Sequence, residues 1–129
     1  MKSTTKRKVG AIATGVAAVT SLGLGASTAL AATSVVSGNL NPNGALVQYA
    51  TYRTKQGYGS IGLNVTNMPS GYLRLGLINA NHVQFSDSIQ WNTKGYKSWS
   101  GVYSGTRFAL QGRMASGGTD TYWSGVLTY

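Results

Sequence analysis

The sequence predicts an all-β protein: a small antiparallel β-sandwich of about seven or eight short strands, with a small β-barrel as the alternative. Apolar and polar residues alternate along several short runs, as they do in strands with one buried face. Turns rich in glycine, asparagine and serine separate these runs at intervals of about ten residues. Beyond residue 31 no segment has the apolar spacing of an amphipathic helix, and most of the 18 glycines lie there and disfavour helix interiors.

Residues 1–31 are predicted to form a secretory signal peptide. A positive segment is followed by the uncharged stretch Val9–Leu24 and by Ala29-Leu30-Ala31, whose small residues suit signal peptidase. The basic residues of the first segment are Lys2, Lys6, Arg7 and Lys8. The apolar stretch is interrupted by polar residues and falls short of the roughly 20 apolar residues that span a bilayer. We therefore expect cleavage after Ala31, a secreted extracellular protein, and no transmembrane segment in the mature chain.

The rest of the chain is predicted to form a single β domain over residues 45–129, preceded by a lead-in segment over residues 32–44. Val35 and Val36 in the lead-in segment are candidates for an edge strand. The domain has no cysteine, so it must fold by packing alone. About 100 residues suffice for such a core.

The clearest strand pattern lies on either side of a turn at residues 67–71. Every second residue of 61–65 and of 73–77 is apolar. Pro69 and Gly71 are typical turn residues, so we expect the two runs to pair as a hairpin. Further strands are predicted at residues 47–53, 82–86, 88–91, 96–103, 107–114 and 122–129.

The sequence lacks the residues that most catalytic sites use. The absence of cysteine excludes thiol catalysis and zinc–thiolate sites, and there is no glutamate. His82 is the one histidine, and Asp87 and Asp120 are the two acidic residues. Both aspartates lie in stretches typical of turns, where Asp accepts hydrogen bonds from nearby amides. We therefore predict a non-enzymatic protein with no catalytic residue, no cofactor and no metal site made of these side chains; calcium bound by backbone oxygens is left open.

Aromatic and basic residues are in excess after residue 31. All 8 Tyr, 3 Trp and 2 Phe lie there, and seven basic residues oppose two acidic ones, which leaves a net charge of +5. Aromatic rings stack on sugar rings, and clustered cations attract anionic polymers. We therefore predict a non-catalytic binding module for extracellular or cell-wall polysaccharide or for an anionic polymer, with a basic aromatic β surface as its site.

Two groups of residues are the candidate sites on this surface. The first is an aromatic platform with flanking lysines, although its two tryptophans could instead pack in the core. The platform comprises Trp91, Tyr96, Trp99 and Tyr103 with Lys94 and Lys97. The second is a basic stripe on the solvent faces of several strands, suited to teichoic-acid-like phosphates or anionic lipid; nucleic acid is not expected, because no nucleic-acid-binding motif is present. The stripe comprises Arg53, Arg74, Arg107 and Arg113.

Two other functions are alternatives. The stretch 52–60 carries Arg53 and Lys55, either of which suits the specificity pocket of a trypsin-like protease. The chain would then be a secreted protease inhibitor or another protein-interaction module. An aromatic rim also suits a membrane-active or antimicrobial protein, although the sequence has no convincing amphipathic insertion segment.

Overall fold

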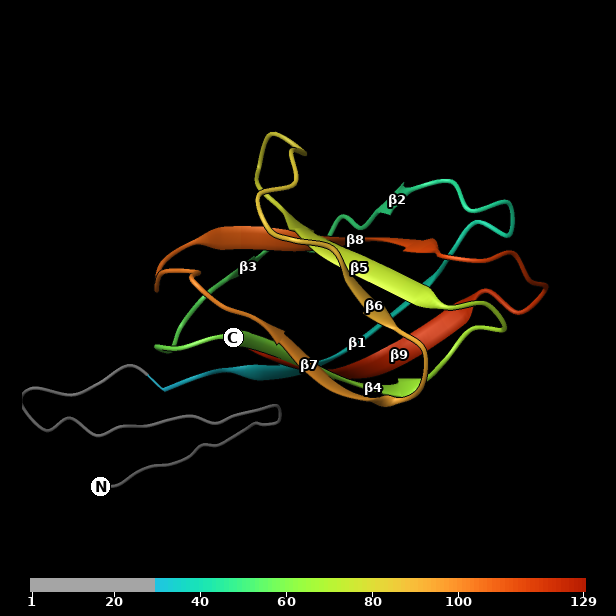
Figure 1. Ribbon diagram of the computed structural model, residues 1–129. Coiled ribbons are helices and arrows are strands. Elements are labelled where there is room, and N and C mark those ends of the chain that lie inside the picture. The colour runs from blue at the N-terminus through green and yellow to red at the C-terminus, as the bar shows by residue number, and fades with distance from the viewer. Residues whose placement is uncertain (1–29) are drawn as a thin grey trace, which may run out of the picture.

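The computed structural model describes residues 30–129, which form nine strands and no helix (Figure 1). One group of strands is β1 (Thr33–Asn39), β4 (Ile61–Asn67), β7 (Gly95–Trp99) and β9 (Tyr122–Thr128); the other is β2 (Val47–Gln48), β3 (Arg53–Thr54), β5 (Leu73–Ile78), β6 (Ile89–Trp91) and β8 (Arg107–Met114). The first group makes a sheet of order β1–β9–β4–β7. The second makes a sheet of order β2–β8–β5–β6, in which β3 also pairs with β8.

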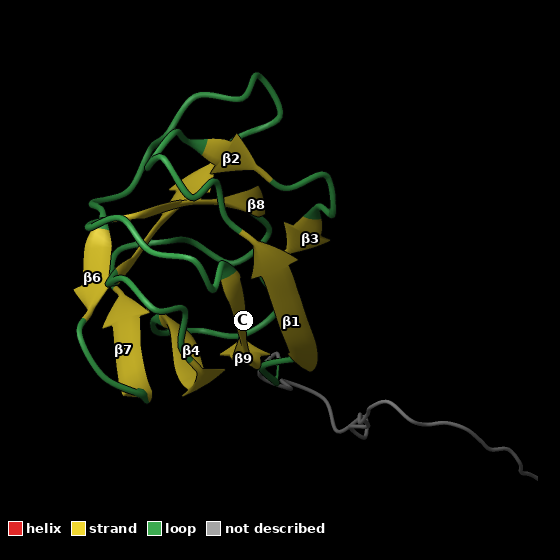
Figure 2. Cartoon of the chain, turned by 90° about the vertical axis from the view of Figure 1, so that its right-hand side faces the viewer, coloured by secondary structure: helices red, strands yellow, loops and turns green. Residues whose placement is uncertain are grey.

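The two sheets pack face to face as an antiparallel β-sandwich. Figure 2 shows β2, β3 and β8 in the layer above β4, β7 and β9, with the β6–β7 connection along one side. Both sheets have free end strands, so the fold is not a closed barrel. The all-β sandwich prediction is confirmed and the barrel alternative is excluded. The described residues hold no helix of a length and apolarity that would cross a membrane.

The core lies between the inner faces of the two sheets. Alternate residues of β4 and β5 are fully buried there, as the period of two predicts. From β8, Phe108, Leu110 and Met114 face the same interior. Burial of one such side chain contributes roughly 1.5–3 kcal/mol, so these three central strands carry much of the stability.

All three tryptophans are also part of the core, and each buried indole N–H has an acceptor. The Trp91 indole donates to the main-chain oxygen of Gly95 at 3.0 Å, and the Trp99 indole donates to the main-chain oxygen of Asp87 at 3.0 Å. The Trp123 indole donates to the hydroxyl of Tyr49 at 2.9 Å. Leaving such a buried donor unpaired would cost about 1–3 kcal/mol. These three bonds therefore fix the segments that carry the acceptors.

The turn at residues 67–71 joins the two sheets and does not close a hairpin. β4 pairs with β7 and β9, whereas β5 pairs with β6 and β8. The hairpin prediction is therefore wrong, although both of its strands are present. Alternation reports which side chains are buried, and strands that face each other across a sandwich alternate in the same way as paired strands.

Residues 79–88 form a loop beside β5, where a strand was expected at residues 82–86; it makes one β-bridge, between Gln84 and Ile78. Its residue His82 has φ of 64°, a left-handed conformation that breaks an extended strand. Gln111 on β8 donates a hydrogen bond to Gln84 in the loop, and Gln48 on β2 donates one to Gln111 at 3.1 Å. This amide network fastens the loop to the sheet.

The other predicted elements differ in extent. The strand expected at residues 47–53 is divided into β2 and β3, and the strand expected at residues 96–103 is β7, which ends at Trp99. The lead-in segment contains β1, which is an end strand of its sheet. The predicted signal peptide, except for its last two residues, lies outside the described part of the chain.

We predict that Gly125→Ala destabilises the fold by about 1–3 kcal/mol. A Cβ at Gly125 in β9 would collide with the main-chain oxygen of Asn64 in the neighbouring strand. Gly117→Ala is the matched control, because a Cβ there would meet its nearest atom at 3.7 Å. Chemical denaturation measures both, and equal stability of the two variants would contradict the prediction.

The Tyr49 hydroxyl generates a pH-dependent prediction. It accepts the Trp123 bond and donates to the main-chain oxygen of Asn39 at 3.0 Å. Burial raises the pKa of Tyr49 above its ordinary value of 10.0, although the bond from Trp123 acts in the opposite direction. A raised folded-state pKa means that this stability is complete below about pH 10 and is lost as pH rises further.

We therefore expect Tyr49→Phe to lower stability at neutral pH by about 1–3 kcal/mol, because the Trp123 N–H loses its acceptor. The same variant should show a smaller stability loss above pH 10 than the wild type. Tyr103→Phe is the control, since the Tyr103 side chain is 83% exposed. Denaturant unfolding at neutral and alkaline pH tests this, and parallel pH profiles for Tyr49→Phe and wild type would count against it.

Candidate functional site

The aromatic platform predicted around Trp91 and Trp99 is not formed as a surface. Their exposed fractions are 0% and 3%, and the two indoles pack edge to face with ring centroids 5.9 Å apart. Neither ring face is available to stack on a sugar. The alternative, in which both rings pack in the core, is the arrangement in the structure. The platform expectation fails for these two residues because aromatic content alone does not show which rings the core uses.

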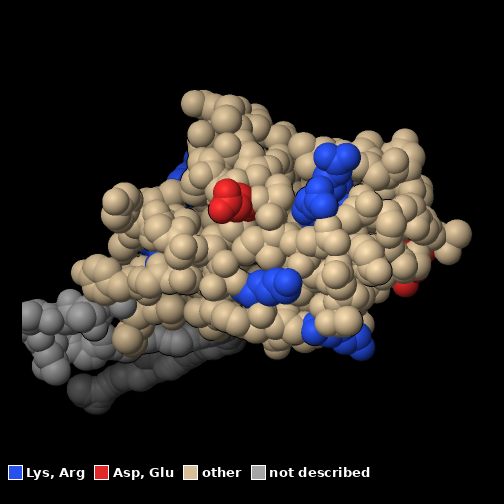
Figure 3. Space-filling view, in the orientation of Figure 1, with Lys and Arg blue, Asp and Glu red and all other residues tan. Residues whose placement is uncertain are grey.

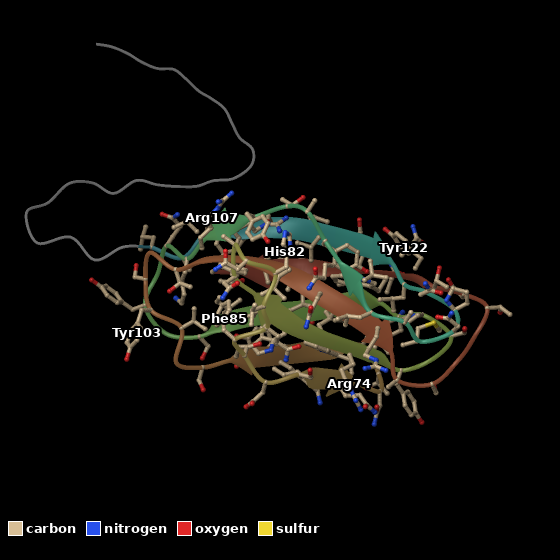
Figure 4. All side chains as sticks on the ribbon, turned by 90° about the horizontal axis from the view of Figure 1, so that it is seen from above. Arg74, His82, Phe85, Tyr103, Arg107 and Tyr122 are labelled. Atoms are coloured by element: carbon tan, nitrogen blue, oxygen red, sulfur yellow. The ribbon has the colours of Figure 1, made fainter. Side chains whose placement is uncertain are left out.

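The remaining platform residues are exposed but lie apart. Tyr96 is on the opposite face of β7 from Trp99 and covers Gly62 of β4, since a Cβ at Gly62 would overlap the Tyr96 ring. Tyr103 follows the end of β7 and projects from a loop at one end of the molecule (Figure 4). Lys94 is exposed in the connection between β6 and β7, and Lys97 is exposed on β7. These side chains do not form one continuous aromatic surface.

Two members of the predicted basic stripe lie side by side. Arg74 on β5 and Arg113 on β8 are directly opposed cross-strand partners, and both are exposed on the outer face of their sheet. Arg74 Nη2 donates a hydrogen bond to Oε1 of Gln90 on β6 at 2.6 Å. Gln90 in turn donates to Asn92 at 2.7 Å. We call Arg74 and Arg113 the arginine pair.

The other two arginines of the stripe are separate from this pair. Arg107 is six residues before Arg113 on β8, roughly 20 Å away along the strand, and Figure 4 places it far from Arg74. Its guanidinium lies 4.7 Å from the centre of the Tyr52 ring, a cation–π contact. The stripe is therefore not continuous.

Arg53 does not lie on the solvent face that the sequence predicted for it. It opposes the buried Phe108 across β3 and β8, so its side chain starts on the inner face of the sheet. Arg53 Nε donates to the Ser34 hydroxyl of β1 at 3.1 Å and thereby bridges the two sheets at their edge. The prediction was wrong because β3 is two residues long, too short for its alternation to be read.

The loop suggested for a protease inhibitor does not present its basic side chains. Lys55 is 1% exposed, and its ammonium donates a hydrogen bond to the main-chain oxygen of Gly57. Burial lowers the pKa of Lys55. With Arg53 held by Ser34, neither of the two basic residues extends toward a protease pocket.

The titratable residues do not assemble into a hydrolytic group. His82 Nδ1 lies 3.4 Å from the Tyr52 hydroxyl and faces no carboxylate within hydrogen-bonding distance. Asp120 accepts a hydrogen bond from the Tyr122 amide at 3.2 Å, as expected for a turn residue. Within residues 30–129 no three His, Asp or Glu side chains are grouped so that they could hold a metal ion.

The surface around the arginine pair is basic and polar. Figure 3 shows basic side chains over the β5–β8 region and over the region of β7 on the same face of the molecule. Tyr72, two residues before Arg74, is 46% exposed on that outer face. Alternation along β5 could have placed Tyr72 beside Arg74. Gln90 was missed because its position depends on strand order, for which the sequence carries no signal.

No protein-family model, curated protein or solved structure matches this chain, so its function is argued from the site alone.

Proposed function

We propose that this protein is a non-catalytic binding module for anionic polymers and that the arginine pair is the centre of its binding surface. The observation that carries the proposal is the direct opposition of Arg74 and Arg113 on neighbouring strands. Like charges at directly opposed positions destabilise a sheet. An anionic group bound between them would remove that repulsion.

The pair suits phosphate, sulfate or carboxylate groups for a second reason. A guanidinium presents several N–H donors in a planar fork that matches these anions, and hydrogen bonds between charged groups are stronger than neutral ones. The Gln90 side chain already occupies one donor of Arg74 and holds the guanidinium in place. Pre-organisation of this kind lowers the entropy lost on binding.

The surrounding charges support a polymer as the ligand. Lys94 in the β6–β7 connection and Lys97 on β7 are exposed, and they extend the positive surface beyond the reach of one small anion. The residues after the predicted leader carry a net charge of +5, which attracts polyanions over long range. With the secretion proposed from the leader, phosphate-bearing polymers of a cell wall fit this description.

Substitution of both arginines tests the proposal. We expect Arg74→Gln/Arg113→Gln to bind inorganic polyphosphate at least roughly ten-fold more weakly than wild type, because charge-assisted hydrogen bonds are lost. The wild type should also lose affinity steeply with salt and should not bind neutral dextran. Isothermal titration calorimetry at several salt concentrations measures these effects.

Arg107→Gln is the control, because it removes one arginine charge from the strand that carries Arg113, at a position already engaged by Tyr52. It should change polyphosphate affinity less than roughly two-fold. Wild-type affinity in the double variant, or an equal loss in Arg107→Gln, would show that the arginine pair is not the site. Thermal unfolding of each variant verifies that it is folded.

A further inference from the structure

A groove of about 510 Å³ lies between residues 85–89, which lead into β6, and residues 98–102, at the end of β7. This volume is within the range of roughly 300–1,000 Å³ typical of small-molecule sites. The groove does not include the arginine pair. The chemistry of its walls differs from that of the basic surface.

The groove is held in its shape by hydrogen bonds to the core. The buried Trp99 indole donates to the main-chain oxygen of Asp87 and so ties one wall to the other. The same loop is fixed to β5, where Leu77 receives a bond from the Phe85 amide at 3.0 Å and donates its own amide to the Ser86 hydroxyl at 2.9 Å. The site therefore exists before a ligand arrives.

Two polar side chains of the groove, Asp87 and Ser100, make no hydrogen bond within residues 30–129, whereas the hydroxyls of Ser86 and Ser88 are already bonded. Asp87 uses its main-chain oxygen for Trp99, and its exposed carboxylate accepts no hydrogen bond from the described residues. Ser100, just after the end of β7, adds a hydroxyl group to the facing wall. A hydroxyl both donates and accepts, whereas the carboxylate only accepts. The complementary ligand carries several O–H donors.

The apolar part of the groove matches the face of a sugar ring. The Phe85 side chain is 41% exposed, and Figure 4 shows it well apart from Tyr122. Val102 is half-buried in the lining. An aromatic face with a carboxylate and hydroxyls beside it can hold the C–H face of a pyranose while its hydroxyls are bonded.

We propose that this groove is a saccharide subsite that takes one uncharged sugar residue through Asp87, Phe85 and Ser100. The Asp87 carboxylate accepts hydrogen bonds from sugar hydroxyls, and Phe85 stacks on the ring. A phosphate or carboxylate group does not suit the groove, because the Asp87 charge repels it. That the sugar belongs to the same polymer as the anionic group rests on the proposed function, but the subsite itself does not.

Titration with uncharged methyl glycosides tests the subsite. Methyl glycosides of glucose, galactose, mannose and N-acetylglucosamine are added to the full-length protein, and amide chemical shifts are followed by NMR. We expect at least one of them to shift amides of residues 85–89 and 98–102 saturably, with millimolar affinity. Asp87→Asn and Phe85→Ala should each weaken that binding at least roughly five-fold, because a single-site polar or stacking contact is lost.

Asp120→Asn and Tyr122→Ala are the matched controls and should leave glycoside binding unchanged, since Asp120 lies in a separate turn and Tyr122 lies on β9. Arg74→Gln/Arg113→Gln should also retain it, so failure of the subsite and failure of the anion site can be told apart. No glycoside shift in the groove would overturn the proposal. Saturable binding of methylammonium there, lost in Asp87→Asn, with no response to glycosides would assign the groove to cations and overturn it equally.

Discussion

The fold depends on three large indole groups being buried in a small core without leaving an N–H unpaired. Each indole N–H has an acceptor from a segment outside its own strand: the first residue of β7, the loop before β6, and the tyrosine between β2 and β3. In a chain with no cysteine, these bonds hold together segments that a secreted domain of this size often joins with disulfides. The short strands β2, β3 and β6 are therefore positioned mainly by packing and side-chain bonds, with little contribution from long backbone ladders.

Sequence periodicity predicts the long strands because each has one buried face. β4, β5, β8 and β9 all occur where alternation indicates them, and their apolar residues enter the core. Strand pairing was not predictable in the same way, because a run of alternating residues carries the same signal whether its neighbour is in its own sheet or in the opposite one. The strand predicted at residues 82–86 is a loop with a single bridge to β5, because His82 adopts a left-handed conformation and the amide group of Gln84 is used to bind Gln111.

The candidate site could be predicted in part. Alternation correctly placed Arg74 and Arg113 on the outer face, but their direct opposition needed the register of β5 and β8. Arg53 was placed on the wrong face, because β3 is only a two-residue strand at the edge of the sandwich and the sequence pattern does not show its orientation. The tryptophans were ambiguous from the start, since a ring suited to bind sugar is also suited to fill a core. Asp87 was correctly placed in a loop, but its carboxylate became a candidate binding group once the structure showed that its main-chain oxygen makes the structural bond.

At position 87 the main-chain oxygen makes the structural hydrogen bond, and the side chain is the candidate binding group. This separation affects how the sequence can vary there. Because the loop at position 87 is anchored through the peptide oxygen, any side chain that tolerates the local backbone can stand there without loosening the indole beneath it. Position 87 can therefore vary under selection at little cost to the core, and related sequences with different residues there would share an architecture while differing in the molecules they capture. The same property makes it a convenient starting point for redirecting specificity by library design.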